Sequence, residues 1–289
     1  MRALLIVNPR ASGVTPESAE AVRRELAAAA ELELVWTEHP GHATHLAAGA
    51  ADAVFVFSGD GGFNELLNGI GAGIPVGFVP GGGSSVLPRA LGVPRDPVTA
   101  ARRLGEALRA GRTRRISLGR VNGRRFGFAA GLAFPAEVVR RVDELGRRNG
   151  RRPPDRTFAF TVARALIARR GSLEPVLELD GEQAAFALVA NGDPYTYLAR
   201  LPLRVAPEAR FERGLEVVAP RRVRARAIPR LTAAAVLGRH APGVIYKHDL
   251  DRIEIRSRAP LPLQVDGEDL GDVEGAVFEC ERDALTVLC

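Results

Sequence analysis

The sequence predicts an α/β protein in two parts: a doubly wound parallel sheet, then a β-rich, sandwich-like part with antiparallel strands. The first part is predicted because apolar strand-like runs alternate with helical segments, and glycine-rich turns follow the runs. The second is predicted because short β-type runs dominate beyond residue 114. We expect the parts to be residues 1–114, with the tail 283–289 packing back on them, and residues 115–282.

Strands and helices alternate regularly in the first part. Strands are expected at 3–7, 32–36, 54–57 and 75–79, and helices at 16–30, 43–51, 63–70, from about 86 to 91 and at 98–110. Thr15 is expected to cap the first helix, with Pro16 at its first position. Such alternation requires right-handed crossovers, which predicts parallel strands with helices on both faces.

In the second part a hairpin is expected first, with strands 115–121 and 124–130 around the turn Asn122-Gly123. Helices are expected at 135–148 and 157–170, joined by the polar segment 149–155, and at 229–238. The remaining elements are short strands at 175–179, 185–190, 215–218, 253–255, 261–265 and 276–280. This pattern is typical of antiparallel sheets.

The composition narrows the class of protein. Hydrophobic residues make up 46%, and no apolar run approaches the about 20 residues that span a bilayer, so no transmembrane segment is expected. Cys280 and Cys289 are the only cysteines, which favours a reduced, cytoplasmic protein. The net charge of +6 comes almost wholly from arginine, since Lys247 is the only lysine. This charge is compatible with acidic membranes, nucleotides or nucleic acid as partners, and equally with GC-rich coding alone.

The segment from Val54 to Glu65 carries the most specific chemistry. Ser58-Gly59-Asp60-Gly61-Gly62 joins a buried strand to a helix, where free backbone N–H groups favour a phosphate. Asp60 would repel a bare phosphate. Its presence therefore predicts that Mg²⁺ or an ordered water lies between the carboxylate and the phosphate, as in a metal-nucleotide complex. Asp60 is the candidate metal ligand.

Several common nucleotide scaffolds are excluded. Lys247 lies in Val-Ile-Tyr-Lys-His, so the chain has no Walker P-loop lysine. The protein-kinase set of strand lysine, helix glutamate and glycine-rich cover is missing too. The dinucleotide fingerprint does not follow the first strand. If the chain binds ATP, it uses another scaffold.

Six motifs follow one another along the chain. They are Asn8-Pro9 with Ser12-Gly13, Thr37 with Gly41-His42-Ala43, Ser58 to Glu65 with Asn68-Gly69, Pro80 to Gly92, Arg115 to Gly119 with Ala130-Gly131, and Gln264 to Glu268. In this order they resemble the bacterial lipid kinases related to diacylglycerol kinase and sphingosine kinase catalytic domains.

The resemblance implies a two-domain kinase that binds ATP in an interdomain cleft, with the lipid entering over the β-rich part. It implies that Asp266 and Glu268 carry the catalytic base, and that Asp60 takes part at Mg²⁺. The implied ATP-binding residues are Asn8, Ser12, Gly13, Thr37, Ser58, Gly59, Asp60, Gly61, Gly62, Asn64, Gly82, Gly83 and Ser84. The residues alone leave another interpretation open for Asp266-Gly267, which is a common turn pair.

The chain departs from the family pattern at several positions. At five of these positions the family has a hydroxyl, amide or carboxylate side chain, and this chain has Gly62, Gly83, Ser85, Val86 and Ser117. At the sixth, Arg213 replaces the aspartate of an Asp-Gly-Leu stretch that lies near a structural Mg²⁺ site in the family. The function predicted is an ATP-dependent lipid kinase acting on a diacylglycerol-like hydroxyl. A degenerate, non-catalytic nucleotide- or lipid-binding relative is the alternative, and a kinase of a soluble substrate such as NAD is a third reading.

Other clusters of residues suggest partners. His39, His42 and His45 have a spacing that suits a metal, but a polar loop and helix start is preferred. Arg147, Arg148, Arg151 and Arg152 form a basic linker that suits anionic headgroups, so peripheral membrane association is expected. Nucleic-acid binding is disfavoured by the 6% aromatic content, and a homodimer is compatible with the sequence.

Overall fold

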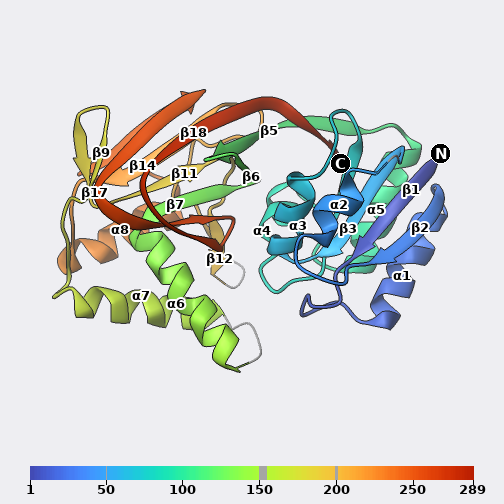
Figure 1. The fold of residues 1–289 in the computed structure, drawn as a ribbon, viewed down its shortest axis with the longest axis horizontal. Coiled ribbons are helices and arrows are strands. Elements are labelled where there is room, and N and C mark those ends of the chain that lie inside the picture. Colours follow the sequence, from blue (N-terminus) through green and yellow to red (C-terminus); the bar gives the residue numbers. More distant parts are fainter. Residues whose placement is uncertain (50, 150–154, 199–200) are drawn as a thin grey trace. The chain divides into compact units, whose positions relative to one another are not determined.

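The computed structural model describes residues 1–49, 51–149, 155–198 and 201–289 (Figure 1). The chain forms two compact units. Unit 1 comprises Met1–Leu118 and Arg282–Cys289, and unit 2 comprises Gly119–Glu281. The division falls inside two long strands, β5 (Thr113–Val121) and β18 (Glu268–Leu288). Each unit is described by itself below.

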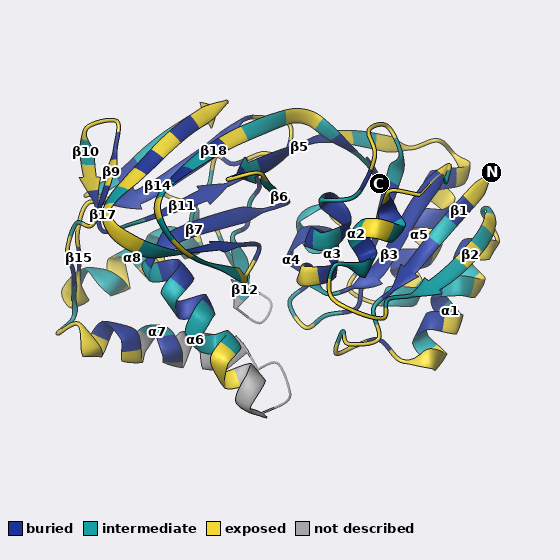
Figure 2. Cartoon of the chain, viewed as in Figure 1, coloured by how far each residue is buried: buried dark blue, intermediate teal, exposed yellow. Residues whose placement is uncertain are grey.

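Unit 1 contains the predicted parallel sheet, in the order β2–β1–β3–β4. The strands are β1 (Arg2–Val7), β2 (Glu31–Trp36), β3 (Ala53–Ser58) and β4 (Pro75–Pro80). They pair in parallel register, and the end of β18 joins them with Thr286 beside Pro75. All six residues of β3 are buried (Figure 2), as expected for a central strand covered on both faces.

Helices cover both faces of this sheet. On one face, α1 (Pro16–Ala27) and α5 (Pro97–Arg109) share a core with alternate residues of β1 and β3. On the other, α3 (Asp60–Leu67) places Phe63 edge-on against Phe78 of β4. The helices α2 (His42–Ala47) and α4 (Val86–Ala90) contact α3. Thr15 caps α1 as predicted, because its hydroxyl accepts from the Ser18 N–H.

Unit 2 is built around an antiparallel sheet with the order β16–β14–β11–β7–β17–β18. Its strands are β6 (Arg124–Phe126), β7 (Ala129–Ala133), β9 (Leu177–Leu179), β10 (Glu182–Ala184), β11 (Phe186–Ala190), β14 (Leu215–Pro220), β16 (Val244–Leu250) and β17 (Arg252–Val265). Short strand pairs also form between β8 (Ser172–Leu173) and β15 (Val223–Arg224) and between β12 (Thr196–Leu198) and β13 (Leu201–Leu203). The predicted fold class is therefore confirmed for both parts.

Three helices accompany this sheet. α6 (Phe134–Asn149) packs on α7 (Asp155–Ala168) and contacts β7, β11 and β17. α8 (Ile228–Leu237), preceded by a 3-10 turn at Ala225–Ala227, ends at Gly238 in the left-handed conformation, with φ of 61°. None of the helices in the described ranges is long and apolar enough to cross a membrane.

Two expectations about strands are wrong, and some strands were not predicted. The predicted strand 124–130 is broken into β6 and β7, because Gly127 and Phe128 turn their N–H groups to a side chain. The predicted strands 253–255 and 261–265 are one strand, β17, whose register shifts between them. β16 was not predicted, since Lys247, His248 and Asp249 hide its β character.

Candidate active site

Four loops of unit 1 follow the carboxyl ends of β1 to β4, the edge where open α/β sheets bind ligands. Backbone hydrogen bonds tie three of them together. Gly13 N donates to Gly81 O at 2.8 Å, and Gly81 N donates to Ser58 O at 2.7 Å. The sequence predictions for residues 8–13, 58–62 and 80–85 thus fall on one connected surface.

The glycines of these loops allow close backbone contact. A Cβ on Gly82 would lie 2.8 Å from Gly59 Cα, and one on Gly13 would lie 3.0 Å from Gly81 O. Any larger residue would push the loops apart. Gly61 and Gly83 differ, because both are exposed and a Cβ there would meet nothing within 4 Å. Gly13 and Gly82 are therefore needed for the close packing of the loops, whereas Gly61 and Gly83 leave open space above the backbone.

The helix α3 begins at Asp60, three residues before the predicted start at Phe63. Its N-cap is Gly59, whose side chain is absent, so no side-chain cap satisfies the first N–H groups. The Gly61 and Gly62 amides therefore belong to a helix N-terminus, where partial positive charge favours an anion.

Asp60 is 5% exposed, and its Oδ1 accepts a hydrogen bond of 2.8 Å from the N–H of Val86. The contact joins the start of α3 to the start of α4, after Ser85 with φ of 42°. Because it uses the backbone of Val86, the contact does not depend on that side chain, and the departure at this position leaves it intact. The role of Asp60 at a metal stays a prediction.

The side chain at position 58 determines which residue fits at position 62. A Cβ on Gly62 would lie 2.1 Å from Ser58 Oγ, which also accepts from Asn8 Nδ2 at 3.1 Å. The threonine of the family pattern at position 62 does not fit beside a serine at position 58. The hydroxyl lost at Gly62 is therefore replaced by one at Ser58, on the neighbouring turn.

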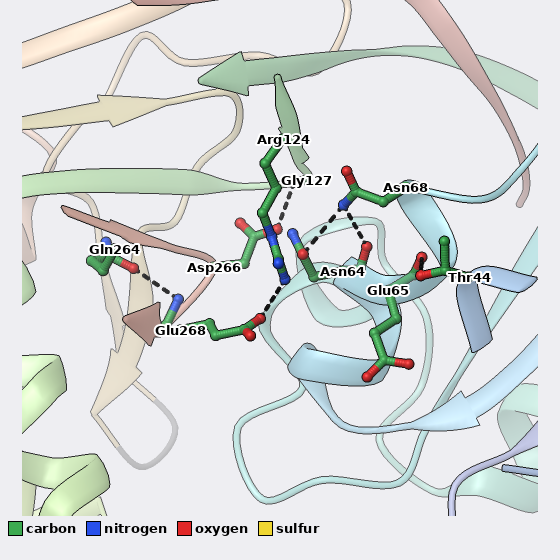
Figure 3. Close-up of polar contacts among 10 residues, drawn as sticks. Thr44, Asn64, Glu65, Asn68, Arg124, Gly127, Gln264, Asp266 and Glu268 are labelled. Atoms are coloured by element: carbon green, nitrogen blue, oxygen red, sulfur yellow. Dashed lines mark hydrogen bonds and ion pairs between the residues drawn. The ribbon is translucent and has the colours of Figure 1, made fainter. Parts of the chain in front are cut away.

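A pocket of about 80 Å³ lies at this edge of unit 1. Its lining includes Asn8, Thr37, Ser58, Gly62 and Glu65. Glu65 was not among the predicted ligand residues, although it closes the Asp60 motif. Its Oε2 accepts from Ala43 N at 3.3 Å, and its carbonyl accepts from Thr44 Oγ1 at 2.8 Å (Figure 3). Glu65 thus fixes the start of α2 beside the pocket.

The other predicted residues of unit 1 are split by exposure. Asn64 is buried, and its carbonyl accepts from Asn68 Nδ2 at 2.9 Å (Figure 3), so it stabilises the end of α3. Ser12 is exposed and Ser84 is half-buried, with the Ser84 carbonyl accepting from Arg89 Nη1 at 3.4 Å.

In unit 2, Asp266 and Gly267 are the two loop residues of the β17–β18 hairpin. Both have positive φ, 49° and 83° respectively, as a two-residue type I′ turn requires. The turn interpretation of Asp-Gly is thus correct, and it leaves the functional one open. Gln264 supports the turn from inside, since its Oε1 accepts from Gly267 N at 2.8 Å (Figure 3).

The Asp266 side chain reaches back to the break between β6 and β7. Oδ2 accepts from Gly127 N at 2.7 Å (Figure 3), and Oδ1 accepts from Phe128 N at 3.0 Å and Ala129 N at 3.1 Å. The residue is 6% exposed. Three backbone donors hold a buried carboxylate in one orientation, which both stabilises the fold and preorganises the group.

Glu268 lies in a different environment. Its side chain is 48% exposed and forms an ion pair with Arg124, Nη2 to Oε2 at 2.5 Å (Figure 3). The two carboxylates that the resemblance pairs are therefore unlike: Asp266 is held by the backbone, and Glu268 is held by one surface arginine.

Unit 2 also contains a pocket of about 700 Å³, within the size range of small-molecule sites. Phe134, Leu173, Val176 and Leu261 contribute apolar walls. Arginines at positions 140, 169 and 170 line it as well, with Arg140 bound to Asp269 and Arg169 to Glu137. The predicted basic linker falls outside the described part of the chain, which leaves out Arg151, Arg152 and the side chains of Arg147 and Arg148.

The sequence of residues 2–121 matches the family "Diacylglycerol kinase catalytic domain". The kinases of this family use ATP. The chain is also similar to a protein of Streptococcus pneumoniae serotype 4 (strain ATCC BAA-334 / TIGR4) named "Putative lipid kinase", with 31% identity over 154 residues. That match covers 49% of this chain and spans half the length of the pneumococcal protein.

Solved structures extend the likeness in fold beyond the residues of the family match. A diacylglycerol kinase from Bacillus anthracis str. Sterne superposes with a TM-score of 0.72 and 19% identity, covering 99% of this chain and 96% of that one. An NAD kinase from Archaeoglobus fulgidus, solved in complex with ATP, gives 0.53 and 12%, covering 100% of this chain and 94% of that one. At these identities the likeness concerns the fold alone.

Proposed function

We propose that this protein is an ATP-dependent lipid kinase that transfers the γ-phosphoryl group to the hydroxyl of a diacylglycerol-like lipid. The observation that supports it most is the convergence of the Gly13, Gly59 and Gly82 loops at the N-terminus of α3 in a diacylglycerol kinase catalytic domain. Backbone N–H groups and small residues there suit a nucleotide phosphate.

The residues of unit 1 fit a nucleotide in three respects. Gly61 and Gly83 leave the backbone open to a ligand. The Asn8 amide and the Ser58 hydroxyl line the pocket with hydrogen-bonding groups. Mg²⁺, when bound, would offset the charge of the phosphates, and Asp60 is the proposed ligand. The hydrogen bond from Val86 N–H to Asp60 Oδ1 would hold the carboxylate in place for this role.

The transfer forms a bond between the lipid oxygen and the γ-phosphorus and breaks the bond to the β-phosphate oxygen, leaving ADP. The hydroxyl proton needs a carboxylate that is ionised at neutral pH. Asp266 is our proposed base because three N–H donors hold its carboxylate in one orientation. Glu268 is proposed to act with it from the exposed side of the hairpin.

The lipid side of the proposal rests on family membership and on the large pocket of unit 2, with apolar walls and arginines. The expected location is the cytoplasmic surface of a membrane, with electrostatic docking. Binding to anionic vesicles should exceed binding to neutral ones and should weaken as salt is added. Equal partition to both vesicle types would contradict the docking, while the kinase assignment would stand.

The decisive experiment incubates the protein and Mg²⁺ with γ-labelled ATP and a total lipid extract, with NAD in a parallel reaction. We expect a labelled lipid and no labelled NADP. Label in NADP alone would establish the soluble-substrate alternative. ATP binding without any labelled product would establish the degenerate relative.

A further inference from the structure

Two histidines and two glutamates gather at one edge of unit 2, away in sequence from every predicted site residue. Among the described residues, Glu208, His240 and His248 form a group of three potential metal ligands. Their donor atoms all lie within 4.8 Å of one another. Glu216 adds a fourth, since its Oε1 lies 3.4 Å from His248 Nδ1.

The distances within this cluster suit a small cation. His240 Nε2 lies 3.5 Å from Glu208 Oε1, and His248 Nδ1 lies 3.8 Å from Glu208 Oε2. Ligands about 2.0–2.1 Å from a tetrahedral Zn²⁺ are separated from each other by about 3.3 Å. The side chains therefore need only small rotations to share one ion.

Glu216 provides an independent indication of a ligand. It is 2% exposed on the buried strand β14 (Figure 2), yet its Oε1 has no hydrogen-bond partner. A buried carboxylate oxygen without a partner costs free energy unless something binds it. The register of β14 and β16 shifts between Leu215 and Val217, so His248 and Asp249 of β16 together oppose Glu216, and the Nδ1 of His248 lies 3.4 Å from the Glu216 Oε1.

The charge around the cluster favours a cation too. Of the nearby arginines, Arg204 pairs with Asp193, and Arg210 donates to backbone carbonyls. Two neutral imidazoles and two carboxylates would balance the charge of one divalent ion.

The ligands are also held in place. The His240 ring stacks on Tyr246, with centroids 4.1 Å apart, and Tyr246 Oη accepts from Ala241 N at 3.0 Å. Glu208 lies between Ala206 and Ala209, which are buried against β14. Preorganised ligands of this kind bind metals more tightly than mobile surface groups.

We propose that Glu208, Glu216, His240 and His248 form a binding site for a divalent transition-metal ion, best suited to Zn²⁺. Two imidazoles with two carboxylates are ligands that Zn²⁺ accepts, whereas Mg²⁺ and Ca²⁺ prefer oxygen alone. The ion would fasten β16, the outermost strand of the sheet, to β14 and to the segments around residues 208 and 240. This site is independent of the phosphoryl transfer.

The test titrates the full chain, freed of metal with a chelator, with Co²⁺ and with Zn²⁺. We expect one equivalent of Co²⁺ with the visible absorption of a four-coordinate ion and without a thiolate band. Zn²⁺ should displace it and raise the melting temperature. Glu208→Gln and His240→Gln should each weaken binding at least about 100-fold, since losing a ligand costs more than losing a supporting contact.

Both substitutions lie at exposed side chains, 51% and 43% respectively, so the fold is expected to survive them. His39→Gln is the matched control, because His39 stacks on His42 in unit 1 as His240 stacks near His248. It should leave binding unchanged. Binding that survives Glu208→Gln and His240→Gln, binding lost in His39→Gln, or a thiolate band from a cysteine would overturn the site, as would the absence of stoichiometric binding.

Discussion

The glycine-rich loops of unit 1 and the Asp266 turn of unit 2 each contain a buried aspartate that accepts backbone N–H groups, but they are assembled differently. Asp60 reaches Val86, 26 residues away, and the loops around it meet through glycine backbones. Asp266 reaches Gly127, 139 residues away, and its carboxylate accepts three N–H groups at the break between β6 and β7. In unit 1 the loops meet through many small backbone contacts, whereas in unit 2 one carboxylate collects the three N–H groups of the break.

The largest effect is therefore expected at Asp266. In Asp266→Asn one of the two carboxylate oxygens becomes an amide N–H₂ group, which cannot accept a hydrogen bond. At least one of the three buried backbone N–H donors therefore loses its acceptor. We expect a loss of about 1–3 kcal/mol in the free energy of unfolding. Turnover should fall by about 10²- to 10⁴-fold if the group is also the base. Denaturant unfolding and the lipid-labelling assay measure the two effects.

Asp180→Asn is the matched control, because Asp180-Gly181 is a turn with the same positive φ angles, 48° and 77°. The Asp180 side chain is 62% exposed and binds Lys247, so its loss should cost less than about 1 kcal/mol. Equal destabilisation by both variants would contradict the special role of the Gly127–Ala129 donors.

Glu268→Gln separates the chemistry from the stability. Its ion pair with Arg124 is half-exposed, so stability should change little. If the carboxylates act as a unit, turnover should fall nearly as far as in Asp266→Asn, and the double variant should be little slower than either single variant. Full activity in Glu268→Gln would remove this residue from the mechanism.

Gly82→Ala tests the backbone contacts of unit 1. Its methyl group would lie 2.8 Å from Gly59 Cα, so the loops must separate at a cost of about 1–3 kcal/mol. The rise in melting temperature with Mg-ATP should shrink as well. Gly83→Ala, with open space at its Cβ, is the control and should change stability by less than about 0.5 kcal/mol. Similar destabilisation in both would show that glycine contact does not hold the loops.

Because the side chains at positions 58 and 62 compete for the same space, we expect the stability effects of substitutions there to be coupled. Gly62→Thr alone should destabilise the fold, because its Cβ overlaps Ser58 Oγ. Adding Ser58→Gly should restore most of the loss, with a coupling energy of about 0.5–3 kcal/mol in a double-mutant cycle. Additive effects of the two substitutions would mean that the two positions do not share one space.

Gly61 is expected to separate nucleotide binding from the stability of the fold. The Cβ of Gly61→Val would meet nothing within 4 Å, so the free energy of unfolding should change by less than about 1 kcal/mol. The side chain nevertheless covers the N-terminus of α3, and the stabilisation by Mg-ATP should disappear. Unchanged nucleotide binding, measured by calorimetry, would place the phosphates elsewhere.

In unit 1, most strands and helices and the gathering of their loops could be predicted from the sequence alone. Local signals suffice there: Thr15 and Pro16 start α1, and a parallel sheet brings the turns after β1, β3 and β4 to one edge. Asn122-Gly123 likewise predicted its hairpin, because both residues accept positive φ. The family motifs added the candidate ligand residues, which stay predictions.

Which side chains meet across long stretches of the chain could not be predicted from local sequence signals, because it depends on the packing of distant elements. The donors to Asp266, the overlap of Ser58 with position 62, and the partners of Glu216 depend on strand register and on which faces pack together. The histidine triplet at 39–45 has metal-like spacing, yet His39 and His42 stack on each other, while His240 and His248 converge from separate segments. Spacing fixes neighbours within an element, whereas a site drawn from several elements is fixed by their packing.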